Sequence, residues 1–334
     1  MSAFDVSNMV RDYGDSQAEA RACRADCALF DFSFMARARI AGSGATESLS
    51  RLQPRSMDDL APGRIRYSVR PDDAGAVAAD LTVWGFDDGV FEVMSGRHDD
   101  IEDLVSMTGQ AVWCEDLSDE TAIFALQGPG ALAALSGLAD IDGLTALPYF
   151  GHGRFRIAGI DCQVGRLGYT GEKGFELIVH ATDGARLWAE LARRARPAGF
   201  AAIDILRIEA GFILFANECG LGATAADLGI AAFADAATDQ ARFRLASFTA
   251  RCAEKSVLWR PDPTATMPRE PDGITVTSAC VSPVAGSVLG LGVVGADYDG
   301  ETAIDPNGWF REIRLTDHPL YDPGKRRPRG DWAP

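Results

Sequence analysis

Residues 168–177 read Gly-Tyr-Thr-Gly-Glu-Lys-Gly-Phe-Glu-Leu. The three glycines predict a turn in which a ligand can approach the backbone closely, because glycine carries no side chain. Apolar and polar residues then alternate from Phe175 onward, which predicts a strand over residues 174–180. Glu176 therefore stands at the start of a strand, beside a glycine turn. Taken alone, this pattern is more often that of a solvated glutamate on a half-buried strand than of a binding site.

Four further motifs occur along the chain. They are Leu-Phe-Asp-Phe-Ser-Phe at 29–34, Ala-Leu-Gln-Gly-Pro at 125–129, Leu-Arg-Ile-Glu-Ala-Gly at 206–211 and Thr-Val-Thr-Ser-Ala-Cys-Val-Ser-Pro at 275–283. Together with residues 168–177, and in this order, they resemble the glycine-cleavage T-protein family of aminomethyltransferase-like folate enzymes. Each motif is weak alone. Five in the family's order, from residue 29 to residue 283, extend the resemblance over nearly the whole chain.

Composition limits the classes of partner. The chain has 334 residues, 47% of them hydrophobic and 24% charged, with a formal net charge of -16. This length exceeds what one hydrophobic core usually supports, so we expect two or three domains. The negative charge argues against nucleic acid and against anionic membrane surfaces as partners. It also makes docking onto another acidic protein electrostatically unfavourable.

Cysteine usage and the chain's ends predict a cytoplasmic protein. The seven cysteines are odd in number and scattered, so we expect reduced thiols rather than a disulfide framework. The N-terminal residues lack a basic region followed by an apolar run, and no stretch of about 18 apolar residues occurs, so we expect neither export nor a membrane span. The four histidines show no metal-ligand spacing, so we expect no metal site.

The pattern of elements favours the α+β class, because strands and helices are mixed without strict alternation. We expect amphipathic or capped helices over 16–29 and 45–52, the second with Ser43 or Thr46 as its cap, and a strand meander over 153–180. Strands at 274–282, 287–295 and 311–316 predict a small all-β C-terminal unit. The polar, proline-rich stretch at 261–273 predicts a loop before it.

The resemblance implies a more specific architecture. Family members fold as a three-domain ring, with two interleaved α+β domains and a C-terminal β-barrel around a central folate channel. Carried over, the first, folate-binding domain holds residues 1–31 and 110–198. The second, which carries the catalytic aspartate, holds residues 32–109 and 199–240. The β-barrel holds residues 241–334.

The resemblance also implies tetrahydrofolate as the cofactor and assigns four site residues. Glu176 matches the pterin-binding glutamate, since a carboxylate suits the two adjacent N–H donors of a pterin. Tyr169 and Tyr67 match tyrosines that line the folate site. Asp80, in Ala79-Asp80-Leu81, matches the catalytic aspartate, although the acid that precedes it in the family is absent here.

Other charged residues have weaker assignments. Glu172 and Glu209 also occupy motif positions, and we expect structural roles for both, such as turn closure or pairing with Arg207 or another buried donor. The basic cluster over residues 325–329 is most simply a solvated end. The alternative is that it meets the glutamate tail of folate.

Two departures from the family concern the donor side. Ile203 stands where the family has an arginine at the folate site, and Gly96 where it has an asparagine. Isoleucine and glycine keep neither the charge of the arginine nor the amide of the asparagine. We therefore expect a different ligand on the donor side of the site. The family's T-P-x-E-A-G-L segment is also eroded, at residues 224–230.

Three functions remain open from the sequence. The first is a demethylase that moves a methyl group from a small methylated donor to tetrahydrofolate. The second is the glycine-cleavage aminomethyltransferase, which works with a lipoyl carrier protein. The third is a non-catalytic folate-binding protein. Retention of Asp80 favours an enzyme, and the changes at 203 and 96 favour the demethylase.

Overall fold

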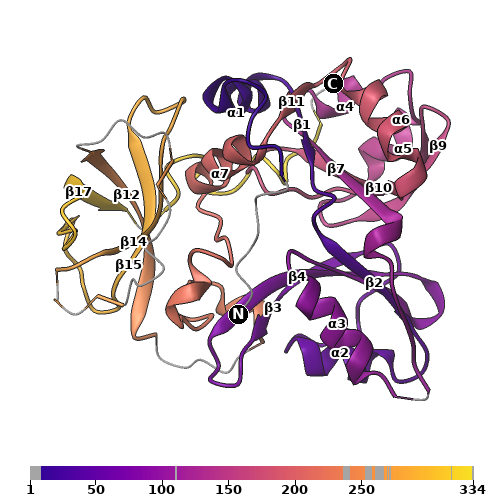
Figure 1. The fold of residues 1–334 in the computed structure, drawn as a ribbon, viewed down its shortest axis with the longest axis horizontal. Helices are drawn as coiled ribbons and strands as arrows, with labels where there is room; N and C mark the ends of the chain where they lie inside the picture. The colour runs from indigo at the N-terminus through magenta and orange to yellow at the C-terminus, as the bar shows by residue number, and fades with distance from the viewer. Residues whose placement is uncertain are drawn as a thin grey trace.

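The computed structural model describes residues 9–332 except residues 110, 236–240, 253–257, 260–266, 269, 271 and 317. Three sheets lie around a central helix, α7 (Figure 1). The predicted α+β class is confirmed, because helices pack on two of these sheets and the third is wholly antiparallel. The loop predicted over 261–273 lies largely outside the described residues.

The first sheet has six strands in the order β11-β1-β7-β10-β9-β8. Their bounds are β1 Ala28–Asp31, β7 Thr121–Gln127, β8 His152–Ile157, β9 Ile160–Gly165, β10 Gly174–His180 and β11 Arg196–Ala198. β8, β9 and β10 form the predicted meander. On one face, Phe175 and Leu177 belong to a buried cluster with residues of α4 (Ala131–Ala134), α5 (Ile141–Ala146) and α6 (Ala181–Leu191). The alternation predicted from Phe175 onward therefore holds.

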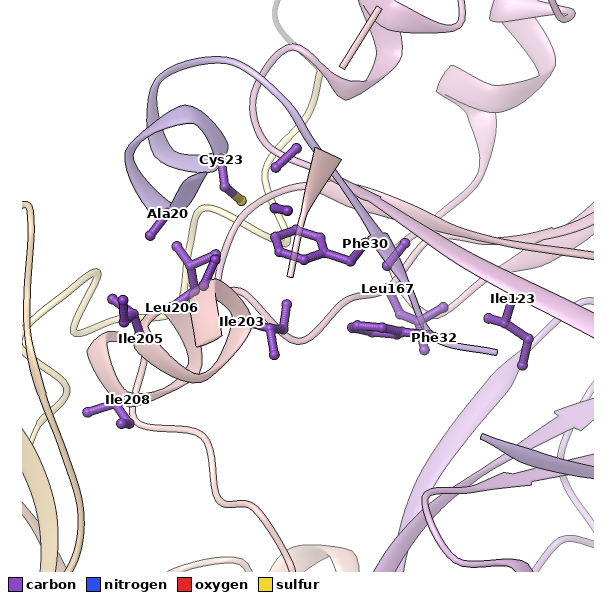
Figure 2. Close-up of a cluster of buried hydrophobic side chains, with 14 of the residues drawn as sticks. Ala20, Cys23, Phe30, Phe32, Ile123, Leu167, Ile203, Ile205, Leu206 and Ile208 are labelled. Atoms are coloured by element: carbon purple, nitrogen blue, oxygen red, sulfur yellow. The ribbon is translucent and has the colours of Figure 1, made fainter. Parts of the chain in front are cut away.

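The other face of this sheet looks toward the centre of the molecule. Ile178 of β10 belongs there to a buried cluster that also holds Phe30, Phe32 and Ile203, shown in part in Figure 2. Glu176 lies two residues before Ile178 on the same strand, and side chains two apart share a face. The sequence alternation thus places this carboxylate on the inner face.

The second sheet has the order β3-β4-β5-β2-β6. Its strands are β2 Ala36–Ala41, β3 Ile65–Pro71, β4 Val77–Gly85, β5 Val90–Ser95 and β6 Trp113–Asp116, and it is covered by α2 Ala45–Leu52 and α3 His98–Met107. The expected cap of α2 was wrong: its N-cap is Gly44, with no side-chain capping bond. A Cβ at Gly44 would lie 2.9 Å from Val112 Cγ2. Close packing against Val112 therefore favours glycine at the start of α2.

The third sheet has the order β13-β14-β15-β12-β17-β16. Its strands are β12 Phe243–Cys252, β13 Leu258–Trp259, β14 Thr275–Val281, β15 Val288–Gly295, β16 Thr302–Ala303 and β17 Phe310–Thr316. An isolated bridge joins Gly273, just before β14, to Ile304, just after β16. The sheet is therefore curled, with segments near its two edges brought together.

Two helices connect the parts of the molecule. α1 spans Ser16–Ala25, and α7 spans Phe200–Glu209 and contacts α1, β14 and β15. The helix expected over 16–29 is therefore too long. Residues 28–31 instead form β1, because their apolar side chains fill the interior between β7 and β11. Four short 3-10 turns complete the described elements: η1 Asp87–Gly89, η2 Ser118–Glu120, η3 Cys219–Leu221 and η4 Ala231–Phe233.

The domain boundaries stay a prediction. The pairing of β6 with β2 bears on them, because β6 follows residue 110 and yet extends the second sheet. A boundary drawn between the first two sheets would fall after residue 116.

Candidate folate site

The glycine turn of residues 168–174 is built around Gln127. A Cβ at Gly168 would lie 1.9 Å from Gln127 Oε1, and one at Gly174 would lie 2.5 Å from Gln127 Cδ. The Gln127 amide donates to the carbonyl of Leu167 (3.1 Å) and accepts from Thr170 Oγ1 (3.1 Å). The glycines at 168 and 174 are therefore required for close approach, and the motif at 125–129 packs directly on the motif at 168–177.

Glu176 is buried without a neutralising partner. It is 7% exposed, and among the described residues the structure records no hydrogen bond or ion pair to its carboxylate. Burial alone raises its pKa to about 7. A buried carboxylate in this condition destabilises the ligand-free protein and is suited to a ligand that brings its own donors.

Asp80 and Tyr67 form a pair on adjacent strands. Asp80 lies on β4 and Tyr67 on β3, and the Tyr67 hydroxyl donates to the Asp80 carboxylate. Burial raises the pKa of Asp80 to about 6, aided by the nearby charge of Asp100, whereas the Tyr67 hydrogen bond opposes this rise. Asp80 is therefore mostly ionised at neutral pH and held by a neutral donor.

Tyr169 is part of the glycine turn and contacts the segment after α7. Its hydroxyl donates to the carbonyl of Ile213, and its ring stacks on Phe212 with centroids 5.9 Å apart. Lys325 of the tail sits 4.7 Å above the Phe212 ring. The two rings are therefore stacked, with a basic group over the Phe212 ring.

The structure brings three of the four predicted residues close together. The carboxylate of Asp80 raises the pKa of both Tyr67 and Tyr169, with burial as the larger cause in each case. Glu176 is not in recorded contact with these three. Its described electrostatic neighbour is Tyr149, whose pKa is raised by burial and to a smaller extent by Glu176.

The remaining motif acids belong to a buried ion cluster. Arg24 donates from Nε to Glu209 (2.9 Å) and from Nη1 to Glu172 (3.2 Å). Glu172 also accepts from the tail residues Arg327 (3.0 Å) and Tyr321. The structural roles expected for Glu172 and Glu209 fit these contacts, with Arg24 as the buried donor.

The two departures from the family line one cavity. Ile203 and Gly96 both contribute to a cavity of about 600 Å³, together with Phe215 and the segment 30–34. A Cβ at Gly96 would lie 2.7 Å from Phe215 Cε1, so the space of a larger residue at 96 is taken by this ring. Ile203 is 1% exposed. Residues 96 and 203 therefore add no polar side chain to this cavity, although Asp31 and Arg97 also line it.

Sequence reasoning missed Phe212, Phe215 and Tyr149 as site residues. Phe212 and Phe215 follow α7 closely, but no motif singles them out, and their positions depend on how α7 packs. Aromatic residues just beyond the motif at 206–211 were the available signal.

Two absences hold for the residues that the structure describes. None of their helices is long and apolar enough to cross a membrane. No group of three or more histidine, cysteine or acidic side chains within the described ranges is arranged to hold a metal ion.

Comparisons with known proteins show the family of the chain. Residues 3–238 match the family model described as GCVT N-terminal domain. The chain belongs to the glycine-cleavage T-protein family. The predicted resemblance is thereby confirmed.

Individual relatives agree with this assignment. The chain is 32% identical over 232 residues to an aminomethyltransferase from Picosynechococcus sp., covering 68% of this chain and 64% of that protein. It therefore spans less than two thirds of that relative. A probable aminomethyltransferase from Halobacterium salinarum is 28% identical over 354 residues, covering 96% of this chain and 94% of the relative.

A solved structure supports the fold. Glycine cleavage system aminomethyltransferase T from Bartonella henselae matches with a TM-score of 0.77 and 22% sequence identity. The match covers 94% of this chain and 92% of that one. The present chain thus has the T-protein fold.

Proposed function

We propose that this chain is a tetrahydrofolate-dependent one-carbon transferase that moves a methyl group from a small methylated donor to tetrahydrofolate. The observation that carries the proposal is Glu176: a 7% exposed carboxylate without a recorded hydrogen bond among the described residues, held beside the glycine turn of the family's motif.

The chemical groups of tetrahydrofolate complement the residues of the candidate site. A pterin edge presents two adjacent N–H donors, which would satisfy the Glu176 carboxylate. Tyr169 and Phe212 provide a flat wall for its ring system. Lys325 lies over Phe212, and Arg329 lies near Tyr149, which is itself near Glu176. These two basic residues would complement the carboxylates of the folate tail.

Asp80 has the properties of a charge-stabilising group. Tetrahydrofolate supplies the nucleophilic nitrogen. As the new N–C bond forms, the bond between the methyl group and its leaving group breaks, the leaving group keeps the electron pair, and the nitrogen later loses its proton to solvent. Asp80, ionised above about pH 6, would stabilise positive charge on that nitrogen, with Tyr67 fixing its orientation.

The cavity at Ile203 and Gly96 supports a free donor. Methyl displacement depends on alignment and exclusion of water more than on a chain of acids and bases. The apolar part of the wall, which includes Ile203 and Phe215, would serve both, while Asp31 and Arg97 add charge elsewhere on the wall. A net charge of -16 also disfavours an acidic protein partner. The seven unpaired cysteines support the cytoplasm as the location.

The alternative function is the aminomethyltransferase of glycine cleavage. The names of the relatives favour it, as does the near-complete coverage of the Halobacterium salinarum protein. In that case a lipoyl carrier protein would present the one-carbon unit. The second alternative is a non-catalytic folate-binding protein, and retention of Asp80 favours an enzyme over it.

The test is an incubation of the purified protein with tetrahydrofolate and a panel of methylated sulfonium, amine, ether and halide donors, followed by mass spectrometry. We expect 5-methyltetrahydrofolate from one donor class, lost in Asp80→Asn. No product with any free donor, together with turnover of aminomethyl-loaded lipoyl carrier protein, would assign the alternative function.

A further inference from the structure

A second cavity, of about 480 Å³, lies between the first and second sheets. Its walls include Arg37 and Arg39 of β2 and Arg154 and Arg156 of β8. Alternate residues of a strand share a face, so each strand presents its two arginines on one side. A protein with a formal net charge of -16 thus places four guanidinium groups around one hollow.

The arginines of β2 share a single carboxylate. Arg37 donates to both oxygens of Glu92 (3.1 and 2.8 Å), and Arg39 donates twice to Glu92 Oε1 (2.9 and 2.6 Å). Glu92 is fully buried. Two cations on one anion leave a positive charge in excess, and Arg39, with its side chain 34% exposed, is the more accessible of the two.

On the opposite wall, Arg154 is available to a ligand. It is exposed, and the structure records no hydrogen bond or ion pair for it within the described part of the chain. It lies across from Gln163, which in turn lies across from Ile178 of β10, so these three form one row over the sheet. Arg156 by contrast pairs with Asp161 at 3.4 Å.

The cavity therefore has two basic sides that come from different sheets. The remaining titratable groups on its wall are His180, at the end of β10, and Cys162 of β9, whose thiol pKa is raised by burial. The four arginines face two carboxylates, Glu92 and Asp161, so the excess charge is positive. Guanidinium forks match the planar oxygens of carboxylates and phosphates, and this volume lies in the range of small-molecule sites.

We propose that this cavity, lined by Arg37, Arg39, Arg154 and Arg156, binds a small molecule that bears two or more oxyanion groups and bridges the two sheets. The site is separate from the proposed folate site: Asp80, Tyr67, Tyr169 and Glu176 are not among its lining residues. The proposal does not depend on the proposed function.

The experiment is calorimetric titration of the full chain with pyrophosphate and, separately, with citrate, at constant ionic strength. We expect saturable binding of at least one anion, weakened about tenfold or more in Arg154→Ala, since a hydrogen bond to a charged group contributes this much. Tighter binding of pyrophosphate would assign phosphates, and tighter binding of citrate would assign carboxylates.

Arg251→Ala is the matched control. Arg251 is an exposed arginine on β12 in the third sheet, so its removal changes the net charge equally without touching the cavity. Unchanged binding in this variant is expected. Equal weakening in both variants, or no saturable binding of either anion to the wild type, would overturn the proposal. Circular dichroism of each variant checks that it is folded.

Discussion

At the scale of single residues, the candidate site holds two buried carboxylates, Glu176 and Asp80, that differ in their hydrogen bonding. Glu176 is buried with no recorded donor among the described residues, whereas Asp80 accepts from Tyr67. Both carboxyl pKa values are raised by burial, Glu176 to about 7 and Asp80 to about 6. Buried carboxylates of this kind lower the stability of the folded protein and are typical of binding and catalytic sites. Substituting them should therefore change both stability and function.

Replacing Glu176 by Gln should remove a pH dependence of stability. The folded-state pKa of Glu176 is raised from 4.5 to about 7. Its favourable contribution is therefore complete below pH 4.5 and is lost as the pH rises through 7. Between pH 5 and pH 8 the wild-type free energy of unfolding should fall by about 2–3 kcal/mol more than that of the variant, measured by urea denaturation.

Glu102→Gln is the control for this comparison, because Glu102 is exposed on α3. Its pH profile should match that of the wild type. Parallel profiles for wild type and Glu176→Gln would show that the carboxylate is solvated or paired in the folded protein.

Replacing Tyr67 by Phe should move the acid limb of the activity profile. The Tyr67 hydrogen bond lowers the pKa of Asp80, so its loss should raise that pKa above its present value of about 6. Turnover as a function of pH should then decline at a higher pH than in the wild type. Tyr298→Phe, in the loop between β15 and β16, should leave the profile unchanged. An unmoved acid limb in Tyr67→Phe would mean that Asp80 does not limit turnover.

At the scale of elements, one arginine joins four segments. Arg24 of α1 reaches Glu209 at the end of α7, Glu172 in the glycine turn and the carbonyl of Thr170, and it lies 3.7 Å over the ring of Tyr321 in the C-terminal tail. The sequence motifs predicted the two acids. They did not predict Arg24, because its role depends on α1 packing against α7.

Replacing Arg24 by Met should therefore be strongly destabilising. Glu172 would keep one cationic partner, Arg327, and Glu209 would lose its recorded ion pair, and removal of one partner from a buried ion cluster costs about 3–5 kcal/mol. Urea denaturation at pH 7 measures this. Arg21→Met, on the exposed side of the same helix, should change stability by less than about 0.5 kcal/mol. Equal effects of the two substitutions would contradict the role given to the cluster.

The elements also show where sequence reasoning succeeds. The strand at 174–180 and the meander before it follow from alternation and glycine turns, which are local signals. The end of α1 does not, since Ala28 and Leu29 continue the helical spacing and yet belong to a strand that pairs with β7 and β11. The entry to α2 likewise depends on Val112, which is distant in sequence.

At the scale of the whole molecule, the cavity at Gly96 and Ile203 draws its wall from separate regions of the chain. Gly96 precedes α3 and Phe215 follows α7, and these two residues occupy the same space. The sequence shows that residues 96 and 203 depart from the family. It does not show that a phenylalanine compensates, because that contact exists only in the folded chain.

This coupling predicts a double-mutant result. Gly96→Ala should cost about 1–3 kcal/mol through overpacking against Phe215, and Phe215→Leu should relieve most of that cost in the double variant. Thermal or urea unfolding of the four proteins gives the coupling energy. Gly109→Ala, where an added Cβ meets nothing within 4 Å, is the control. Additive effects would show that residue 96 has room for a side chain.

The most direct measurement of the central claim is calorimetric titration of tetrahydrofolate at pH 7 in two buffers of different ionisation enthalpy. If the pterin binds the Glu176 carboxylate, binding should release about half a proton, since the pKa of about 7 leaves this group half protonated. Wild type should then show a buffer-dependent enthalpy, and Glu176→Gln weaker binding without that dependence. Tetrahydrofolate binding of equal affinity and equal proton release in both proteins would contradict the account.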